Sequence, residues 1–493
     1  MRTILILMDS LNRRFLKAYH SHAKGITPNI DRFSEDCVRF DNHFIGSAPC
    51  MPARRDIMTG RMNFLERNWG GIEPFDITLP EELRKNGVFT HIITDHAHYF
   101  ETGGENYCQL FDTWDFQRGQ EQDPWISKVN RPAIDQTSYG RKSAQHLLNY
   151  TAYSIAEEDY PTPRTFRSAC QWVADNKGCQ DFFLMVEAFD PHEPFEAPRE
   201  YLDLYGDTYQ GPEFNWPGYA PLTEPQEAVE HLKNSYLAAL TMADKWLGKF
   251  IEALKENNLY EDTLILLTTD HGLMLGEHGY IAKNFMHAYN ELSHLPLLVK
   301  MPDGKYKGQH RTQLTQNVDL MPTILEHHRI SVPHRVRGRS LFSYIRNRAP
   351  SREQVIYGWF GRAVNVYDGR FTYFRAPKNK DNKPCHQYCG IPSTLGRYFG
   401  EDYAGEIEMG RFLSYTDYPV YKIPAKGEKD WWGDLKDVME SKLFDLQEDY
   451  EQNKPLVNEE LEQKMCKKLM AGMKEAQAPG EQYERLGLTG GVV

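Results

Sequence analysis

The chain has 493 residues, of which 40% are hydrophobic and 26% are charged, and its formal net charge is −12. This length exceeds the usual size of a single hydrophobic core, so we expect a large domain and a smaller one. The negative charge argues against a nucleic-acid partner, eight cysteines are too few for a disulfide scaffold, and no apolar run approaches the roughly 18 residues that span a membrane.

The first apolar segment, residues 2–8 (RTILILM), runs directly into Asp9 without a small-residue cleavage site. It therefore predicts a first buried strand rather than a signal peptide. On this basis we expect a cytoplasmic protein that does not associate with membranes.

Strand-like and helix-like stretches alternate through the first 350 residues. Thr27 and Pro28 predict the start of a helix, and Thr78 and Glu81 predict a capping box for a helix that Gly87 ends. Further strands are predicted over residues 88–94, 181–189 and 263–269, and further helices over residues 162–178 and about 225–257. Apolar strands that alternate with helices are typical of a largely parallel sheet covered on both faces.

Acids and histidines follow four of the predicted strands. They are Asp9-Ser10, Asp95-His96 with His98, Asp190 with His192, and Asp270-His271. One such pair would be interpreted as a turn cap. In open α/β sheets, however, the binding site lies beyond the carboxyl ends of the strands, so four pairs together predict one polar site.

The pattern changes near residue 350. Segments 354–360, 362–375 and 442–456 predict short antiparallel strands, with a turn at Asp368-Gly369 and a final helix. We therefore predict an α/β domain with a large, mostly parallel sheet over residues 1–350 and a smaller α+β domain over residues 351–493.

Several residues leave alternatives open. Cys385 and Cys389 are spaced like metal ligands but lack a second pair, which favours ordinary loop or core thiols. Glu277-His278 resembles a metal-binding pair, although a loop-shaping role is favoured. Arg13, Arg14 and Lys17 form either a solvated helix face or the edge of an anion-attracting mouth. The aromatic stretches 367–374 and 429–434 either stack on a sugar ring or pack one domain on another.

Residues 47–61, SAPCMPARRDIMTGR, place a cysteine between two prolines and follow it with two arginines. The prolines predict an extended loop, where a buried structural thiol would be unusual, and Arg55 is expected to face solvent or to pair with a carboxylate. Cys50-Met51-Pro52-Ala53-Arg54 with Thr59-Gly60 resembles the signature of the formylglycine-dependent sulfatase family, which belongs to the alkaline-phosphatase-like superfamily. The resemblance continues in segments 190–195, 268–283, 317–325 and 443–456.

This resemblance implies a role for Cys50. In sulfatases a maturation enzyme oxidises the cysteine to formylglycine, an aldehyde that hydrates to a gem-diol. One hydroxyl attacks sulfur and the other, once deprotonated, expels sulfate, so Cys50 would be the precursor of the nucleophile. The extended loop would suit modification before folding.

The resemblance also implies that Asp9, Ser10, Asp270 and His271 hold one divalent cation against residue 50. Typical sulfatases have two acids where this chain has Asp9-Ser10, so Ser10 would contribute a hydroxyl or backbone oxygen. Oxygen ligands favour Ca²⁺ or Mg²⁺, and a histidine among fewer acids favours Mn²⁺. Ca²⁺ is our first expectation.

The remaining roles follow by position. Arg54 would orient the nucleophile, Lys283 would bind an ester oxygen, and His192 would bind the substrate and protonate the leaving alcohol. Many sulfatases have Gly-Lys-x-His where this chain has residues 95–98. His98 would keep the catalytic histidine's role, and His96 would replace the lysine in substrate binding.

The predicted function is the hydrolysis of a sulfate ester, from a small sulfated carbohydrate. A phosphonate monoester or phosphodiester hydrolase with the same oxidised cysteine is the alternative, and a catalytically silent protein that binds an anion or a partner is a third. The oligomeric state stays open.

Overall fold

Strand β1 (Arg2–Met8) lies in the middle of the main sheet of the computed structural model, which describes residues 1–347, 349–427, 430 and 433–488. Within these residues the main sheet has nine strands. β1 pairs in parallel with β8 (Thr263–Thr268) and β6 (Phe182–Ala188), and the parallel run continues through β4 (Phe89–Thr94) to β5 (Thr113–Phe116). Each of these strands except β5 was predicted from an apolar run.

The other edge of the main sheet is mixed. β12 (Leu297–Lys300) runs antiparallel to both β8 and β2 (Val38–Phe44). β11 (His294–Leu295) is antiparallel to β2, whereas β13 (His310–Gln316) is parallel to it. The predicted class, an α/β protein with a large and mostly parallel sheet, is therefore confirmed.

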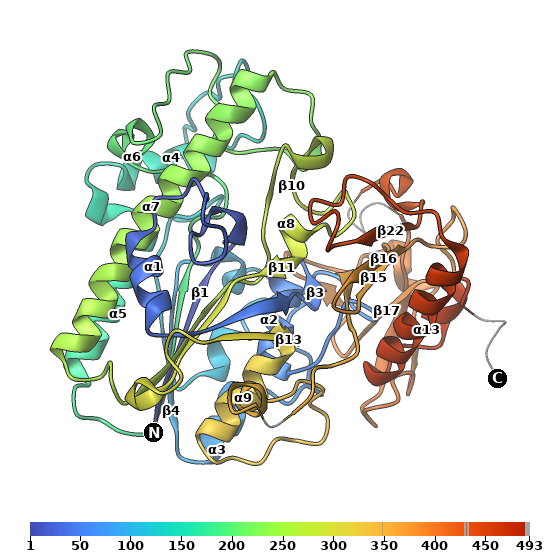
Figure 1. Cartoon of the computed structure of the whole chain (residues 1–493). Coiled ribbons are helices and arrows are strands. Elements are labelled where there is room, and N and C mark those ends of the chain that lie inside the picture. The colour runs from blue at the N-terminus through green and yellow to red at the C-terminus, as the bar shows by residue number, and fades with distance from the viewer. Residues whose placement is uncertain (348, 428–429, 431–432, 489–493) are drawn as a thin grey trace.

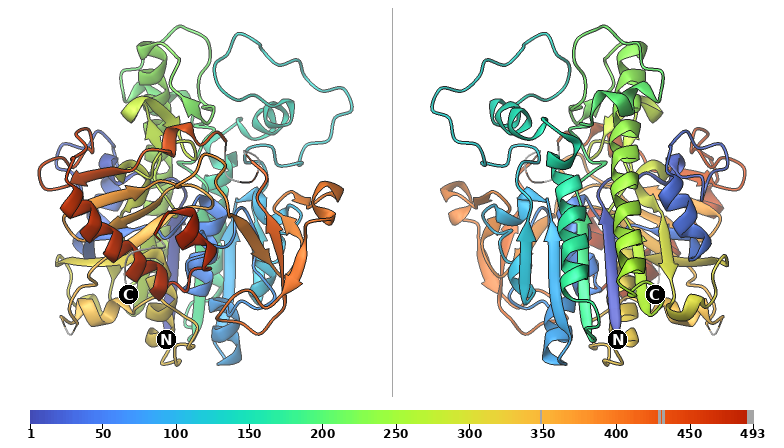
Figure 2. Two further views of the ribbon diagram at one scale, coloured as in Figure 1. Left: turned by 90° about the vertical axis from the view of Figure 1, so that its right-hand side faces the viewer. Right: turned by 90° about the vertical axis from the view of Figure 1, so that its left-hand side faces the viewer.

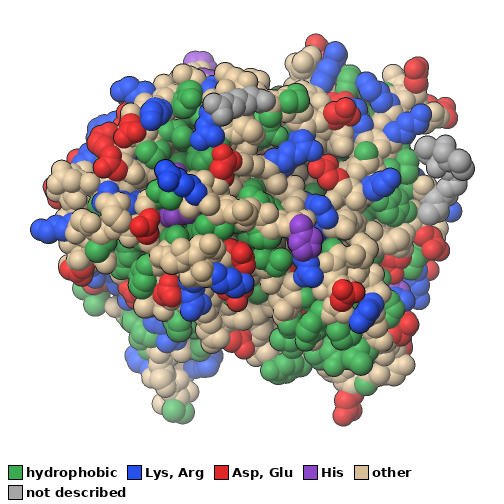
Figure 3. All heavy atoms as spheres, turned by 90° about the horizontal axis from the view of Figure 1, so that it is seen from below, with side chains coloured by type: hydrophobic (Ala, Val, Ile, Leu, Met, Phe, Trp, Pro, Cys, Tyr) green, Lys and Arg blue, Asp and Glu red, His purple; other side chains and the backbone are tan. Residues whose placement is uncertain are grey.

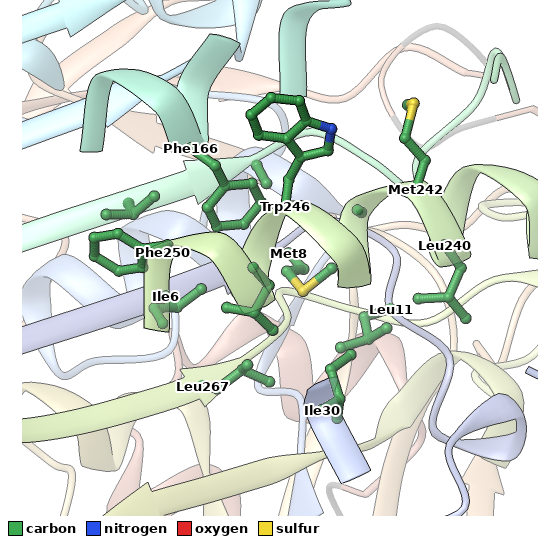
Figure 4. Close-up of a cluster of buried hydrophobic side chains, with 14 of the residues drawn as sticks. Ile6, Met8, Leu11, Ile30, Phe166, Leu240, Met242, Trp246, Phe250 and Leu267 are labelled. Carbon is green, nitrogen blue, oxygen red and sulfur yellow. The ribbon is translucent and has the colours of Figure 1, made fainter. Parts of the chain in front are cut away.

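Helices cover both faces of this sheet (Figures 1 and 2). α1 (Pro28–Glu35), α5 (Pro161–Asp175) and α7 (Gln226–Glu256) bury their apolar stripes against one face, where Met8 and Leu267 meet Phe166 and Trp246 (Figure 4). Residues of α2 (Cys50–Thr59), α3 (Leu79–Lys85), α9 (Leu320–His327) and α10 (Leu341–Ile345) share a second buried cluster with the other face. The burial of both faces explains why the central strands are predominantly apolar.

The start of α3 differs from the prediction. Thr78 is its N-cap, but its hydroxyl donates to the Glu81 carboxylate (2.7 Å) and accepts no hydrogen bond from a backbone N–H, so the predicted capping box does not form. Gly87 follows the helix with a φ of +76°, a conformation that favours glycine, and the predicted end of the helix is correct.

A second sheet lies beside the first, on the right of Figure 1. Its order is β22 (Lys442–Asp445), β16 (Phe371–Arg375), β15 (Val364–Tyr367), β14 (Val355–Trp359) and β3 (Ser47–Ala48). The predicted Asp368-Gly369 turn joins β15 to β16, and α13 (Glu459–Glu475) packs on the sheet through Met465, Leu469 and Met473. Since β3 comes from the N-terminal part of the chain, this sheet crosses the proposed division at residue 350.

The remaining elements are short. Three-stranded sheets join β7 (Ala220–Pro221), β10 (Tyr280–Ala282) and β9 (Met274–Leu275), and β17 (His386–Cys389), β21 (Val420–Pro424) and β20 (Glu408–Gly410). A two-stranded ribbon joins β18 (Ser393–Thr394) to β19 (Arg397–Tyr398). The other α-helices among the described residues are α4 (Ala144–Tyr153), α6 (Arg199–Asp203), α8 (Asn290–Ser293), α11 (Glu401–Ala404) and α14 (Glu481–Arg485).

Figure 3 looks at the molecule from below, where the parallel strands begin. Basic and acidic side chains are interspersed over this face. Across the described part of the chain, every helix is too short or too polar to cross a lipid bilayer.

Candidate active site

The residues that follow β1, β4, β6 and β8 meet beyond the carboxyl ends of these strands, as predicted. Four side chains form the centre of the group: Asp9, Cys50, Asp270 and His271. All four are buried, and one potential ligand atom from each lies within 4.8 Å of the others. The N-terminus of α2 completes the group by bringing Cys50 to the strand ends.

Cys50 does not lie in an extended loop, and that prediction was wrong. It is the first residue of α2 and only 2% exposed. Pro49 and Pro52 are compatible with this position because the first backbone N–H groups of a helix have no partner within the helix. The Sγ atom lies 3.0 Å from His271 Nε2 and 4.0 Å from His192 Nε2, and burial raises the pKa of the thiol well above its usual value.

Arg54 lies one helical turn after Cys50 and is fully buried. Its guanidinium binds three carboxylates: Nε donates to Glu187 Oε1 (2.5 Å), one terminal nitrogen to Asp270 Oδ2 (2.5 Å) and the other to Asp9 Oδ2 (2.7 Å). Three formal negative charges thus face one fixed positive charge. Burial alone would raise the pKa of Asp9, but the charges of His192 and Arg54 hold it well below its usual value.

Ser10 connects the two aspartates. Its hydroxyl donates to Asp9 Oδ1 (2.8 Å) and its backbone N–H to Asp270 Oδ1 (3.1 Å). Ser10 has a φ of +57°, and Tyr236 holds this turn by donating its hydroxyl to the Ser10 carbonyl (2.9 Å). Ser10 therefore lies within the predicted metal site and orients both carboxylates.

The tautomer of His271 follows from its contacts. Nδ1 lies 2.7 Å from the carbonyl oxygen of Gly272, which can only accept, so Nδ1 carries the proton. Burial lowers the pKa of His271, which keeps the ring neutral. The lone pair of Nε2 consequently points to Cys50, as a metal ligand requires.

His192 and Lys283 form the opposite wall. Lys283 Nζ donates to His192 Nε2 (2.7 Å), and His192 Nδ1 donates to the Glu193 carbonyl (2.5 Å). The Glu193 carboxylate lies 3.6 Å from Lys283 and accepts a short hydrogen bond from Tyr219. Burial alone would lower the pKa of Lys283, but the neighbouring Cys50 and Glu193 raise it well above its usual value.

The two histidines after β4 differ in their surroundings. His96 is buried 3.7 Å from Asp9 Oδ2, and its ring nitrogens have no hydrogen-bond partner among the described residues. Burial lowers its pKa well below the usual value. His98 instead pairs with Glu101 (2.8 Å) and Glu121 (3.2 Å), which raise its pKa to about 10 although burial alone would lower it. Both nitrogens of His98 are thus occupied by carboxylates, and its catalytic role stays a prediction.

The sequence interpretation missed several residues of the site. Glu187 is the one acid within strand β6 (Phe182–Ala188), and an acid inside a buried strand is a sequence signal for a functional residue. Glu193 stood inside the quoted segment 190–195. Asn317, whose side-chain amide donates to the backbone of Asp270 (3.2 Å), stood inside the segment 317–325. Tyr219 had no sequence signal, because it comes from an irregular segment.

Most open alternatives now have a structural answer. Glu277 accepts from the Leu275 N–H (2.6 Å) and His278 stacks on Tyr289, which supports the loop-shaping role. Cys385 and Cys389 are free, buried thiols in separate clusters.

The basic residues near the site are also paired. Arg55 is buried against Asp76 (2.7 Å), Arg13 donates to the Asp41 carbonyl (2.8 Å), and Arg14 pairs with Glu291 (2.6 Å). The aromatic residues of segment 367–374 pack within the second sheet, whereas Trp431 and Trp432 lie outside the described residues.

Comparisons with known proteins identify the family and the fold. The sulfatase family profile matches residues 2–330. The arylsulfatase of Clostridium perfringens is 24% identical over 381 residues, which cover 69% of this chain and 78% of that enzyme. A structure solved with its substrate, D-glucosamine-2-N,6-O-disulfate, superposes with a TM-score of 0.67 at 17% identity over 99% of this chain and 98% of that one. The phosphonate monoester hydrolase of Agrobacterium radiobacter also has a TM-score of 0.67, at 17% identity over 96% of both chains.

The family match and the shared fold place the chain among the hydrolases of the alkaline-phosphatase-like superfamily. Because the sulfatase family profile matches residues 2–330, the chain belongs to the sulfatase family and is a sulfuric ester hydrolase.

Proposed function

We propose that this protein hydrolyses the sulfate ester of a small carbohydrate, with residue 50 as formylglycine and one divalent cation at the site. The observation that carries the proposal is the convergence of Asp9, Cys50, Asp270 and His271 within 4.8 Å. A carbohydrate is favoured because a structure with the same fold was solved with a sulfated glucosamine as its substrate.

The donor set fits a divalent cation. Three buried carboxylates face one guanidinium, and an excess of buried negative charge requires a counter-charge. Asp9, Asp270 and His271, with the hydroxyl of Ser10, would hold the cation. Oxygen-rich ligands favour Ca²⁺, while the imidazole keeps Mn²⁺ and Mg²⁺ as alternatives.

When bound, the cation supplies a Lewis acid for the ester oxygens, and the hydrated aldehyde made from Cys50 supplies the nucleophilic hydroxyl. Cys50 is 2% exposed, so a maturation enzyme has access to it only before the chain folds. In the folded protein, Arg54 fixes Asp9 and Asp270 relative to each other and offsets part of their charge.

Lys283 and His192 control the proton of the leaving alcohol. Because His192 donates through Nδ1, its Nε2 shares the proton of Lys283 Nζ at 2.7 Å. This pair lies beside Cys50, where it can bind an ester oxygen and deliver the proton to the departing alkoxide. Glu193 and Tyr219 hold the pair in place.

A phosphonate monoester or phosphodiester is the second candidate substrate. Ser10 and His96 are both neutral where the family pattern has charged residues, so the site has fewer charges for substrate recognition. A sulfate monoester and a phosphonate monoester are both monoanions, and charge alone therefore does not distinguish them.

A side-by-side assay on 4-nitrophenyl sulfate and 4-nitrophenyl phenylphosphonate tests the proposal. We expect kcat/KM to be at least ten-fold higher for the sulfate, and removal of the cation by a chelator to abolish both activities. A preference for the phosphonate would establish the second candidate, and turnover of neither by fully matured, metal-loaded protein would contradict both.

A further inference from the structure

A cavity of about 260 Å³ lies between residues 133–150 and residues 196–216, in the part of the chain that includes α4. Figure 1 places α4 beyond the carboxyl ends of the parallel strands, the side of the sheet on which the candidate active site lies. The volume is just below the roughly 300 Å³ at which pockets for drug-sized ligands begin, so the cavity suits a single ring.

The cavity walls combine aromatic and polar side chains. Tyr139, Tyr150 and Trp216 provide rings. Trp216 is only 2% exposed, and the Arg141 guanidinium lies over its ring. Tyr139 and Tyr150 are partly exposed and offer ring surface to a bound molecule.

Two chain segments connect the cavity directly to the active site. Glu196 lines the cavity, and three residues earlier Glu193 lies 3.6 Å from Lys283. Trp216 also lines the cavity, and three residues later Tyr219 donates its hydroxyl to Glu193. Each segment therefore presents one side chain to the cavity and another to the wall that holds the proton donor.

Arg141 makes the third connection. Its guanidinium carbon lies 4.7 Å from the centre of the Trp216 ring and 5.4 Å from that of Tyr219. One terminal nitrogen is 3.7 Å from Glu121, the partner of His98. Since Tyr219 also lies under Lys283 Nζ at 5.6 Å, one aromatic ring separates the guanidinium that lines the cavity from the ammonium at the active site.

The chemistry of the walls suits a neutral, polyhydroxylated ring. Aromatic faces pack on the C–H face of a pyranose, and planar carboxylate, amide and guanidinium groups bind its hydroxyls. The cations Arg141 and Lys142 are matched by the acids Asp135, Glu196 and Glu213. Because both signs are present, a second strongly anionic group is disfavoured there.

We propose that this cavity is a subsite for a hexose ring joined to the sulfated unit of the substrate. The proposal rests on the sulfatase function proposed above and narrows its substrate to a di- or oligosaccharide. One neutral ring occupies the cavity while the sulfate ester lies at Cys50 and Lys283.

The test measures binding rather than turnover. The metal-loaded protein is titrated, with NMR detection, with cellobiose, lactose, N,N′-diacetylchitobiose and unsulfated chondroitin disaccharide. The monosaccharides that make up each disaccharide are titrated separately for comparison. Two variants alter the cavity: Ser138→Trp fills it from a partly exposed loop position, and Arg141→Ala removes the connecting guanidinium. The matched control is Lys249→Ala. Lys249 is exposed on α7, and its ammonium lies 3.4 Å from the ring centre of a different tryptophan, Trp246.

We expect at least one disaccharide to bind the unaltered protein with a Kd at least ten-fold below that of its monosaccharides. Ser138→Trp and Arg141→Ala should each remove this advantage, and Lys249→Ala should retain it. Equal binding of every disaccharide and its monosaccharides, or an advantage that survives Ser138→Trp, would overturn the subsite. Turnover of 4-nitrophenyl sulfate, measured on the same samples, distinguishes failure of the subsite from failure of the sulfatase proposal. If the unaltered protein binds a disaccharide with the expected advantage but does not turn over the sulfate, the sulfatase proposal is contradicted and the subsite is not.

Discussion

At the scale of single residues, the charge of Arg54 is distributed among three acids. Glu187 binds its Nε atom, and the two aspartates bind the terminal nitrogens, so the guanidinium has no unpaired nitrogen. Glu187 is also the one of these three acids that the sequence analysis did not identify. Its carboxylate both orients Arg54 and adds to the negative charge that a cation would balance.

We predict that Glu187→Gln lowers the affinity for the divalent cation about ten-fold and the free energy of unfolding by about 1–2 kcal/mol, through the loss of a charged hydrogen bond. Elemental analysis after dialysis and urea unfolding measure the two effects. Asp76→Asn is the matched control, since it removes the carboxylate from the buried Arg55 pair outside the site. It should destabilise the fold without changing metal affinity, and an equal loss of metal from both variants would contradict the role of Glu187.

The contribution of His192 to kcat is predicted to increase with the basicity of the leaving group. His192→Ala should lower kcat on an alkyl or sugar sulfate by about 10²–10⁴-fold, but much less on 4-nitrophenyl sulfate, whose phenolate leaves without protonation. Comparing kcat for the two substrates tests this directly. Losses of equal size on both substrates would assign His192 to binding or positioning instead.

His98 is predicted to stabilise the fold through its ion pairs with Glu101 and Glu121. Its pKa is about 10 in the folded protein against 6.5 for an unperturbed histidine, so its contribution is fully present below pH 6.5 and is lost as the pH rises to 10. His98→Gln should cost about 2 kcal/mol at pH 6, after allowance for its partial exposure, and almost nothing at pH 10. Unfolding measured at both values checks this, and a pH-independent difference would refute it.

At the scale of elements, apolar runs were sufficient to predict the central strands, because both faces of β1, β6 and β8 are buried. The same reasoning placed their terminal acids and histidines at one edge. It failed at α2, where two prolines around Cys50 suggested a loop. Proline is compatible with the first turn of a helix, so the local pattern did not distinguish the two structures.

Gly272 is required where the segment after β8 passes α8. A Cβ atom at this position would lie 1.9 Å from the backbone oxygen of Glu291, and the Gly272 carbonyl is the acceptor that orients His271. We predict that Gly272→Ala lowers the free energy of unfolding by about 1–3 kcal/mol and reduces kcat. Gly405→Ala, where a Cβ atom meets nothing within 4 Å, is the control. Thermal unfolding of both variants tests this prediction. Equal stabilities of Gly272→Ala and Gly405→Ala would contradict the predicted clash.

At the scale of the whole molecule, the two sheets meet next to Cys50. β3 ends at Ala48 and pairs in parallel with β14, so the second sheet helps to fix the start of α2. No local pattern predicts this pairing, since β3 has two residues and its partner lies some 300 residues away. The cavity beside the site was likewise invisible in the sequence, because it is formed by irregular segments that come together only in the folded chain.

The central claim is that residue 50 works as formylglycine and not as a thiol. Peptide mass spectrometry of residues 47–61, carried out on preparations that differ in sulfatase activity, tests it most directly. We predict that specific activity is proportional to the fraction of residue 50 converted to the aldehyde, and that fully thiol protein is folded, binds metal and is inert. A fully active preparation in which every molecule carries an unmodified Cys50 would contradict the account.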